Sequence, residues 1–283
     1  MADEVTKRRA KLGVELRKAR SAAKMTQAQV AAKLGCRQGK INKIETTQCA
    51  VSSRDLSMLL AIYDLPERDK VAIQMLAVQV GGVPTSSMSR VYLQMRALEP
   101  ETTEILTLHS ERMPGLLQSE HYTRTQLARA GDAADMAALL WDRQERIRVL
   151  TVENRPRYRV ILSESSLYRM PGGRAPHLVA DQAQYMLDFC AAHEHISVQI
   201  LTYNADIPFL DPDFTVLKFA GAQSDVAYVE YATEGRILRR AKTVAERERY
   251  WHQLRRAALT HEDSRSFLHD LVALARRPVE RPC

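Results

Sequence analysis

The apolar residues of the first 80 positions recur every three or four residues, which is the spacing of one buried stripe along an α-helix. Leu12, Leu16 and Ala19 form such a stripe, while Lys11 and Arg17 fall on the other side. The same spacing predicts helices at residues 12–23, 26–34, 37–45 and 52–63, and a fifth helix after Pro66. The second and third helices are short and cannot bury enough surface alone, so they must pack among the other three.

Capping signals separate the two short helices. Thr26 with Gln29 three residues later is a capping-box pattern that opens a helix, and Gly35 stands where a helix of about two turns would stop. The next helix follows after only a few residues, with Ile41 and Ile44 facing the core. The sequence therefore predicts a helix, a tight turn and a second helix inside a five-helix unit.

The composition changes after residue 80. The stretch GGVPTSSMS, at residues 81–89, combines Gly, Pro and Ser and is typical of a linker. We therefore expect a first domain over residues 1–80, a linker over 81–90 and a second domain over 91–283.

The second domain mixes helical and strand patterns. Alternating polar and apolar residues predict strands at residues 157–162, 196–203, 214–220 and 226–232. A helix between the first two strands favours parallel pairing, and the short gap between the last two favours a hairpin. Further helices are expected at residues 91–98, 120–149, 179–192, 242–259 and 264–276. The predicted fold class is mainly α with an α/β part: a five-helix N-terminal domain, then a mixed α/β domain with about four strands and flanking helices.

The positive charge is concentrated in the first domain. Residues 1–80 contain 15 Lys and Arg against 8 Asp and Glu, whereas residues 81–283 contain 26 of each kind. Residues 7–43 hold 12 basic residues and a single acid. A field of one sign on one small domain indicates a polyanionic partner, either nucleic acid or an anionic membrane surface. Since no aromatic residue precedes Tyr63 to stack on single-stranded bases or anchor a membrane helix, duplex DNA is favoured.

Composition argues against several other classes. The sequence has no apolar run long enough to span a membrane, and its charged N-terminus lacks the apolar core of a signal peptide. The cysteines are scattered without the spacing of a zinc site or a disulfide framework; they are Cys36, Cys49, Cys190 and Cys283. We expect a cytoplasmic protein in a reducing compartment, with no metal and no cofactor.

The segment MTQAQVAAKLGCRQGKINKIE, at residues 25–45, resembles the DNA-binding helix-turn-helix of the lambda-repressor-like, or XRE, family, and the resemblance extends over residues 13–65. In this geometry one helix enters the major groove, while the preceding helix crosses the backbone with its N-terminus at a phosphate. The DNA-binding residues that the resemblance implies are Gln27 at the phosphate, Gln38, Gly39 and Lys43 in the groove, and Arg37, Lys40 and Asn42 beside them.

Two positions depart from the family's pattern. Arg37 stands where the family has a Ser or Thr cap, and Gly39 stands where it has a polar side chain. Glycine inside a helix costs about 1 kcal/mol against alanine. Gly39 therefore either lets the backbone approach DNA closely or contributes no readout at all. The resemblance also implies that Arg20 and Glu45 tie the first helix to the third, and that Cys36 is a packed thiol in the turn.

Five further motifs follow in order through the second domain: PGLLQSEHY (114–122), WDRQERI (141–147), VILSESSLYRMPGG (160–173), DQAQYMLDF (181–189) and VAYVEY (226–231). Together they resemble the downstream domain of bacterial helix-turn-helix regulators of the Scr family, which are described as antitoxin-like. Ser163 departs from the acid that often precedes the residue equivalent to Glu164. The resemblance implies a regulator of transcription that often acts beside a small partner protein encoded nearby.

Enzyme chemistry finds little support in the second domain. Ser165, Glu164 and His177 lack the G-x-S-x-G elbow of a hydrolase. The C-x2-H-x-H cluster at residues 190–195 lies where a helix end meets a strand, which separates its three side chains.

The sequence therefore predicts a sequence-specific, duplex-DNA-binding transcriptional regulator that is not an enzyme. We expect it to form a homodimer at the nucleoid and to respond through its second domain to a small-molecule effector or a protein partner. Two alternatives remain. One is an antitoxin-like interaction protein that holds a small partner and uses DNA binding for autoregulation. The other is an enzyme acting on nucleic acid or nucleotide, with the first domain as its tether.

Overall fold

The computed structural model divides into two compact units. One unit comprises Met1–Pro100 and Ala137–Asp142, and the other comprises Glu101–Met136 and Arg143–Cys283. The structure describes residues 2–80, 90–130, 140, 143, 146–153, 155–171, 173, 175–231 and 235–276. Most of the segment predicted as a linker, residues 81–89, lies outside the described residues, so this boundary stays a prediction.

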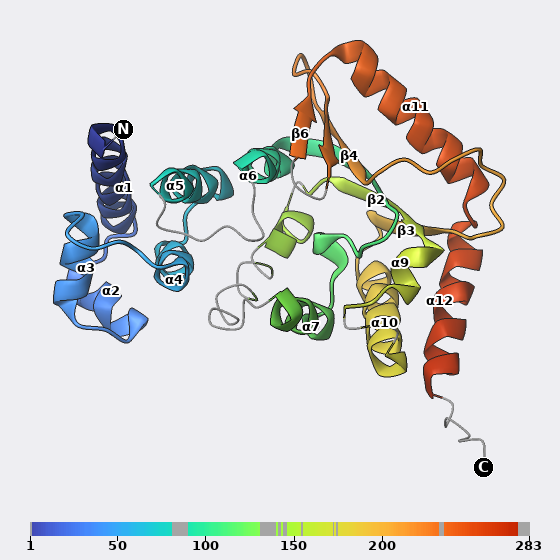
Figure 1. Cartoon of the computed structure of the whole chain (residues 1–283), viewed down its shortest axis with the longest axis horizontal. Coiled ribbons are helices and arrows are strands. Elements are labelled where there is room, and N and C mark those ends of the chain that lie inside the picture. Colours follow the sequence, from blue (N-terminus) through green and yellow to red (C-terminus); the bar gives the residue numbers. More distant parts are fainter. Residues whose placement is uncertain are drawn as a thin grey trace. The chain divides into compact units, whose positions relative to one another are not determined.

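The first unit is helical throughout its described elements (Figure 1). Its helices are α1 (Ala2–Ala22), α2 (Gln27–Leu34), α3 (Gln38–Glu45), α4 (Ser53–Tyr63), α5 (Glu67–Gln79) and α6 (Arg90–Leu98). The five helices predicted from the apolar spacing are α1 to α5, so this part of the fold prediction is confirmed. The short helices pack as expected, because α2 contacts α3 and α4, and α3 also contacts α1.

A single apolar core joins α1 to α5. Core side chains with at most 1% exposure include Leu16, Val30, Ile41, Leu59 and Leu60. The stripe predicted on α1 faces this core, and the charged residues predicted on the other side of α1 are exposed. The basic surface of the first unit is therefore a solvent-facing layer over a continuous core.

Gly13 allows α1 to pack closely against the end of α3. A Cβ at this position would lie 2.5 Å from the carbonyl oxygen of Glu45 and 2.8 Å from Cγ2 of Thr47. Real Cβ atoms do not approach backbone so closely, so Gly13 is required by the crossing of the two helices.

A mixed sheet forms the centre of the second unit. Its described strands are β1 (Thr102–His109), β2 (Arg157–Ser163), β3 (Ile196–Leu201), β4 (Phe214–Phe219), β5 (Val226–Glu230) and β6 (Gly235–Leu238). They lie in the order β3-β2-β1-β4-β5-β6. The pairs β1–β2 and β2–β3 are parallel, whereas β1–β4, β4–β5 and β5–β6 are antiparallel. The predicted parallel pair and the predicted hairpin are both confirmed, as β2–β3 and β4–β5.

The mixed α/β class is confirmed, but the expected four strands were too few. The sequence prediction missed β6, which is only four residues long, and the central strand β1. Four consecutive residues of β1, from Ile105 to Leu108, are buried. A strand covered on both faces loses the alternation by which a strand is recognised in sequence.

Helices cover the sheet of the second unit (Figure 1). Helices α9 (Glu164–Tyr168), α10 (Pro176–Ala192), α11 (Ala241–Ala257) and α12 (His261–Arg276) contact its strands, and α7 (Glu120–Ala130) packs against α10. Helix α11 packs along β1 to β5 over a core that contains Leu106, Ile161 and Val216. The buried indole Nε1 of Trp251 donates a hydrogen bond of 3.0 Å to the carbonyl oxygen of Thr107, which fixes α11 to the central strand.

Candidate nucleic-acid interface

The two short helices of the first unit begin and end where their capping residues predict. The amide N–H of Gln29 donates to Thr26 Oγ1 over 3.2 Å, and the amide N–H of Thr26 donates to Gln29 Oε1 over 2.9 Å. Gly35 ends α2 with a φ of 68°, and the N–H of Cys36 then donates to the carbonyl oxygen of Ala31 over 2.9 Å. The capping box and the glycine stop are therefore confirmed.

Helix α3 presents one face to the core and the other to solvent. Ile41 and Ile44 are 1% and 4% exposed. Arg37 occupies the N-cap with an extended backbone, and its side chain makes no capping hydrogen bond. Its guanidinium group is therefore not committed to ending the helix, which suits a residue that contacts a ligand.

The structure brings six of the seven predicted DNA-binding residues together along α3 and its N-cap. All six are exposed: Arg37, Gln38, Gly39, Lys40, Asn42 and Lys43. Among the described residues, Arg37 and Lys43 have no ion-pair partner, so both cations are available to an external anion. A short helix with uncompensated cations on its outer face suits binding in a groove of DNA.

Gln27 differs from the other six residues because its side chain is already engaged inside the protein. It is the first residue of α2 and is partly buried, and its Nε2 donates to Glu45 Oε2 over 2.9 Å. One N–H and the amide oxygen remain outside this bond. The predicted phosphate contact would therefore come from an amide whose position is held by α3.

Glu45 is a buried acid that contacts residues of both α1 and α2. Its side chain is 1% exposed and accepts hydrogen bonds from Arg20, with Nε at 2.6 Å and Nη2 at 3.0 Å. Arg17 Nε lies 3.6 Å away. Burial alone would raise the pKa of Glu45, but hydrogen bonds from Arg20 and Gln27 outweigh burial and lower the pKa. The expected tie between the first and third helices is confirmed.

Lys40 is paired with an acid that the sequence reasoning missed. Its Nζ lies 2.8 Å from Oδ1 of Asp55, and Ser52 Oγ donates to the other oxygen of Asp55 over 2.8 Å. The signal in the sequence was the spacing of Ser52 and Asp55, which is that of a capping pair at the start of α4. Lys40 thus joins α3 to α4.

Gly39 is exposed, and a Cβ placed there would meet no atom within 4 Å. The fold therefore does not require glycine at this position. Cys36, predicted as a packed thiol, is partly buried and packs against the core.

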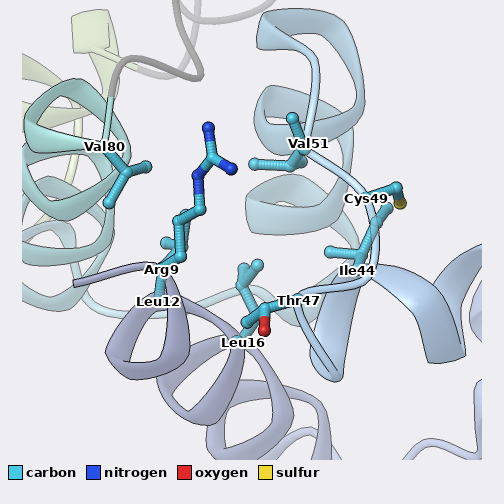
Figure 2. Close-up of a pocket in the computed structure, with 10 residues that line it drawn as sticks. Arg9, Leu12, Leu16, Ile44, Thr47, Cys49, Val51 and Val80 are labelled. Atoms are coloured by element: carbon cyan, nitrogen blue, oxygen red, sulfur yellow. The ribbon is translucent and has the colours of Figure 1, made fainter. Parts of the chain in front are cut away.

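A small apolar crevice lies beside α3 within the same unit (Figure 2). Core side chains line it, including Leu12 and Leu16 of α1, Ile44 of α3, and Val80 directly after α5. Arg9 stands at its mouth, with the guanidinium group directed toward the space between Val80 and Val51. The crevice is a feature of core packing, because its walls offer no set of converging polar groups.

In the second unit, polar contacts gather on residues 109–119, which comprise the last residue of β1 and the ten residues after it and are called here the β1-end segment. Ser119 Oγ donates to Asp181 Oδ2 over 2.6 Å, and the N–H of Ser119 donates to Gln182 Oε1 over 2.9 Å. Gln182, which is fully buried, also donates through Nε2 to the carbonyl oxygen of Leu117 over 2.7 Å. Two of the five sequence motifs of this domain therefore meet here.

The remaining motifs meet the same segment. Ser165 Oγ donates to Glu111 Oε1 over 2.9 Å, and Arg112 Nη1 lies 3.4 Å from Glu230 Oε1. At Gly115, an added Cβ would lie 2.1 Å from a guanidinium nitrogen of Arg143. Four motifs that are far apart in sequence thus contact the β1-end segment, and the segment itself contains the start of the fifth, at residues 114–119.

Asp213, directly before β4, holds the start of the β1-end segment beside the end of β1. Its Oδ1 accepts hydrogen bonds from the N–H of Ser110 over 2.8 Å and from Ser110 Oγ over 2.7 Å, and His109 Nδ1 lies 3.3 Å from Oδ2. Burial alone would raise the pKa of Asp213, but these contacts hold the pKa far below its usual range. Asp213 is therefore charged and has a structural role, because it fixes His109 and Ser110 beside β4.

The residues that could be grouped as catalytic sets are engaged elsewhere. Glu164 Oε2 accepts from the N–H of Tyr203 over 2.9 Å, Ser165 bonds Glu111, and His177 stacks on His121 with ring centroids 5.5 Å apart. Within the described part of the chain, no group of three His, Cys, Asp or Glu residues could hold a metal ion.

His195, from the cluster weighed as a metal site, uses both ring nitrogens. Its Nε2 lies 2.8 Å from the carbonyl oxygen of Leu150, and its Nδ1 accepts from Arg155 Nε over 3.0 Å. Burial lowers the pKa of His195, and the charge of Arg155 lowers it further, in keeping with a neutral ring. Burial also raises the pKa of the nearby Cys190 thiol to about 11.

Two family models match the chain. One, described as a helix-turn-helix domain, matches residues 11–72, and the other, described as a domain of unknown function (DUF5753), matches residues 92–270. No curated protein and no solved structure matches it. Among the described helices, none is long and apolar enough to cross a membrane. The first match supports a DNA-binding domain that contains α2 and α3.

Proposed function

Because the chain belongs to the DUF5753 family and carries a helix-turn-helix DNA-binding domain before the family's own domain, we propose that it is a sequence-specific regulator of transcription. The observation that carries the proposal is the outer face of α3. It exposes six residues suited to DNA contact, and two of its cations, Arg37 and Lys43, have no ion-pair partner among the described residues.

In the proposed complex, α3 enters the major groove and the start of α2 meets the backbone. Gln38 and Lys43 contact base edges, because an amide or an ammonium group there can match the donors and acceptors that distinguish base pairs. Gln27 contacts a phosphate with the part of its amide that Glu45 leaves free.

The proposed regulator binds as a homodimer. Two helix-turn-helix units would lie about 34 Å apart on a pseudopalindromic site, one DNA turn from centre to centre. Six phosphate contacts would give a slope near −5 in a plot of log affinity against log salt, at about −0.9 per contact. Acting on DNA, the protein would work in the cytoplasm at the nucleoid.

The second unit is proposed to receive the signal, either an unknown small-molecule effector or a small protein partner encoded nearby. Support comes from the resemblance of five motifs to the antitoxin-like Scr regulators, and from their meeting at the β1-end segment. No catalytic step is assigned to either unit, because the side chains that could form a hydrolase or metal set make other contacts.

Selection of bound sequences from random duplex DNA tests the proposal. The full-length protein should enrich one DNA motif with two-fold symmetry. Binding to this motif should persist as the salt concentration is raised, whereas binding to random DNA should disappear. Salt-sensitive binding without any enriched motif would contradict sequence-specific regulation and favour a DNA-tethered enzyme.

A further inference from the structure

The loop that joins β3 to β4, residues 202–213, holds an apolar ring in solvent. Phe209 is 62% exposed, one of the few large hydrophobic side chains in the described part of the chain with such exposure. A single exposed hydrophobic residue is ordinary on a protein surface. What sets Phe209 apart is how firmly its backbone is held.

Tyr250 of α11 holds the loop at Phe209 and at Asp211. Its hydroxyl donates to the carbonyl oxygen of Phe209 over 3.0 Å and accepts from the N–H of Asp211 over 3.1 Å. The rings of Phe209 and Tyr250 stack with centroids 6.0 Å apart. Arg247 forms an ion pair with Asp211, one turn before Tyr250 on the same helix.

The remainder of the loop is anchored as well. Ala205, Ile207 and Leu210 pack against the core beneath α11. Pro208 precedes Phe209 directly and restricts the backbone further. The exposed face of the ring is therefore presented in a fixed position, which lowers the entropy that a partner must remove on binding.

The loop also carries charge of one sign. It contains Asp206, Asp211 and Asp213 but no Lys, Arg or His. Asp211 and Asp213 are paired with Arg247 and Ser110, whereas Asp206 is exposed and has no partner among the described residues. A free carboxylate thus lies three residues from the exposed ring.

We propose that this loop, the Phe209 loop, is a docking site for a protein partner that encloses the ring in an apolar pocket and places a Lys or Arg beside Asp206. The inference rests on the proposed function and deepens it, since it names the surface through which a partner would reach the second unit. At protein interfaces a few anchor residues, many of them aromatic, carry most of the binding energy.

Other occupants fit this surface less well. The phosphates of DNA would be repelled by Asp206. A second copy of this chain whose two-fold axis passed through the loop would bring the two Asp206 carboxylates together, and they would repel each other. A protein partner with a Lys or Arg at this position would instead be attracted by the carboxylate of Asp206.

The test selects short displayed random peptides on the immobilised full-length protein. Bound peptides should combine an apolar cluster with Lys or Arg, and their affinity should fall about tenfold or more for Phe209→Ala, as expected for an aromatic anchor. Asp206→Asn should weaken binding about threefold at low salt, as expected for a charge at the rim.

The control variant is Leu274→Ala, which removes another exposed apolar side chain, on α12. It should leave peptide affinity unchanged. If no peptide is enriched, if the enriched peptides are acidic, or if Phe209→Ala binds them as the wild type does, the docking site is wrong. If light scattering showed that Phe209→Ala converts a wild-type dimer into a monomer, the loop would bind a second copy of the chain, and this result would also overturn the proposal.

DNA affinity of the same variants separates this inference from the proposed function. Both Phe209→Ala and Asp206→Asn should bind random and selected duplexes as the wild type does, because neither residue belongs to the first unit. Loss of peptide binding with intact DNA binding therefore concerns the Phe209 loop alone.

Discussion

Lys40 on α3 is neutralised by Asp55 on α4, with Nζ and Oδ1 2.8 Å apart. Ser52 fixes the acid in place by donating to its second oxygen and by accepting from its backbone N–H. The side chain of Lys40 is still 44% exposed. One cation of the proposed DNA-binding face is therefore held by the protein before DNA arrives.

Removing the charge of Asp55 should release Lys40 to the DNA backbone. In Asp55→Asn we expect tighter binding of random duplex DNA and a salt slope steeper by about 1, the value of one added phosphate contact. The loss of fold stability should stay below about 1 kcal/mol, because the Lys40 side chain is 44% exposed and water screens its charge. Fluorescence anisotropy over a range of salt concentrations measures the slope.

Glu15→Gln is the matched control for Asp55→Asn. It removes one acid from the same unit and breaks the exposed pair of Glu15 with Lys18 on α1, at 2.9 Å. An equal steepening of the slope in both variants would show that net charge matters and that Lys40 does not.

Two glycines of the first unit should respond to alanine in opposite ways. Gly39→Ala should raise the free energy of unfolding by about 0.5–1 kcal/mol, since the methyl group has open space and alanine favours the helix. Gly13→Ala should lower it by more than about 1 kcal/mol, because its Cβ would overlap the backbone at Glu45. Urea denaturation followed by far-UV circular dichroism measures both.

The same Gly39→Ala variant decides between the two roles of this glycine. A stable variant that loses affinity for its selected DNA site would show that the backbone of α3 must approach DNA closely. Unchanged affinity would show that Gly39 takes no part in readout.

The buried carboxylate of Glu45 should make the first unit sensitive to acid. A carboxylate whose pKa is lowered in the folded state stabilises the fold at pH values above its unfolded pKa, and this stabilisation is lost as pH falls through the folded pKa. The ordinary pKa of a glutamate side chain is 4.5, and that of Glu45 is lower in the folded protein. The stabilisation by Glu45 should therefore begin to fall near pH 5 and continue to fall below it. This loss is measured as the fall of the thermal midpoint of the first unit with pH, read from the methyl NMR signals of Ile41.

Glu15→Gln should keep the pH profile of the wild type, since Glu15 lies on the surface of α1. Glu45→Gln should lose stability at neutral pH and show a flatter profile. A profile of Glu45→Gln parallel to that of the wild type would remove Glu45 as the source of acid sensitivity.

Gln182 should be essential to the stability of the second unit. It is fully buried and bonds two backbone groups, the N–H of Ser119 and the carbonyl oxygen of Leu117. Gln182→Ala leaves both unsatisfied and should cost about 2–4 kcal/mol. Gln184→Ala, which removes only a local bond to Asp188 on the exposed side of α10, should change stability by less than about 0.5 kcal/mol. Equal losses on thermal unfolding would contradict this account.

Local signals in the sequence were sufficient for the first unit. Thr26, Gln29 and Gly35 act through hydrogen bonds to residues within five positions, so their effect is visible in the sequence itself. The same holds for the apolar stripes of α1 and α3, whose spacing follows from the helical repeat. These features place the helix-turn-helix and its outer face correctly.

Contacts between distant residues could not be predicted in the same way. Asp55 lies 15 positions after Lys40, and Gln182 lies 63 positions after Ser119, so neither pairing follows from spacing. The central strand β1 was missed because burial on both faces removes alternation. The meeting of five motifs at the β1-end segment required the order of the strands, which the sequence does not encode locally.

Affinity for a selected DNA site relative to random duplex, measured for the wild type and Lys43→Ala, tests the central claim most directly. Lys43→Ala should lower this ratio by about tenfold or more, the value of one specific base contact. Gln27→Ala and the exposed Lys11→Ala should weaken both kinds of DNA alike and leave the ratio unchanged. An equal loss on both DNAs for Lys43→Ala would contradict readout by the outer face of α3.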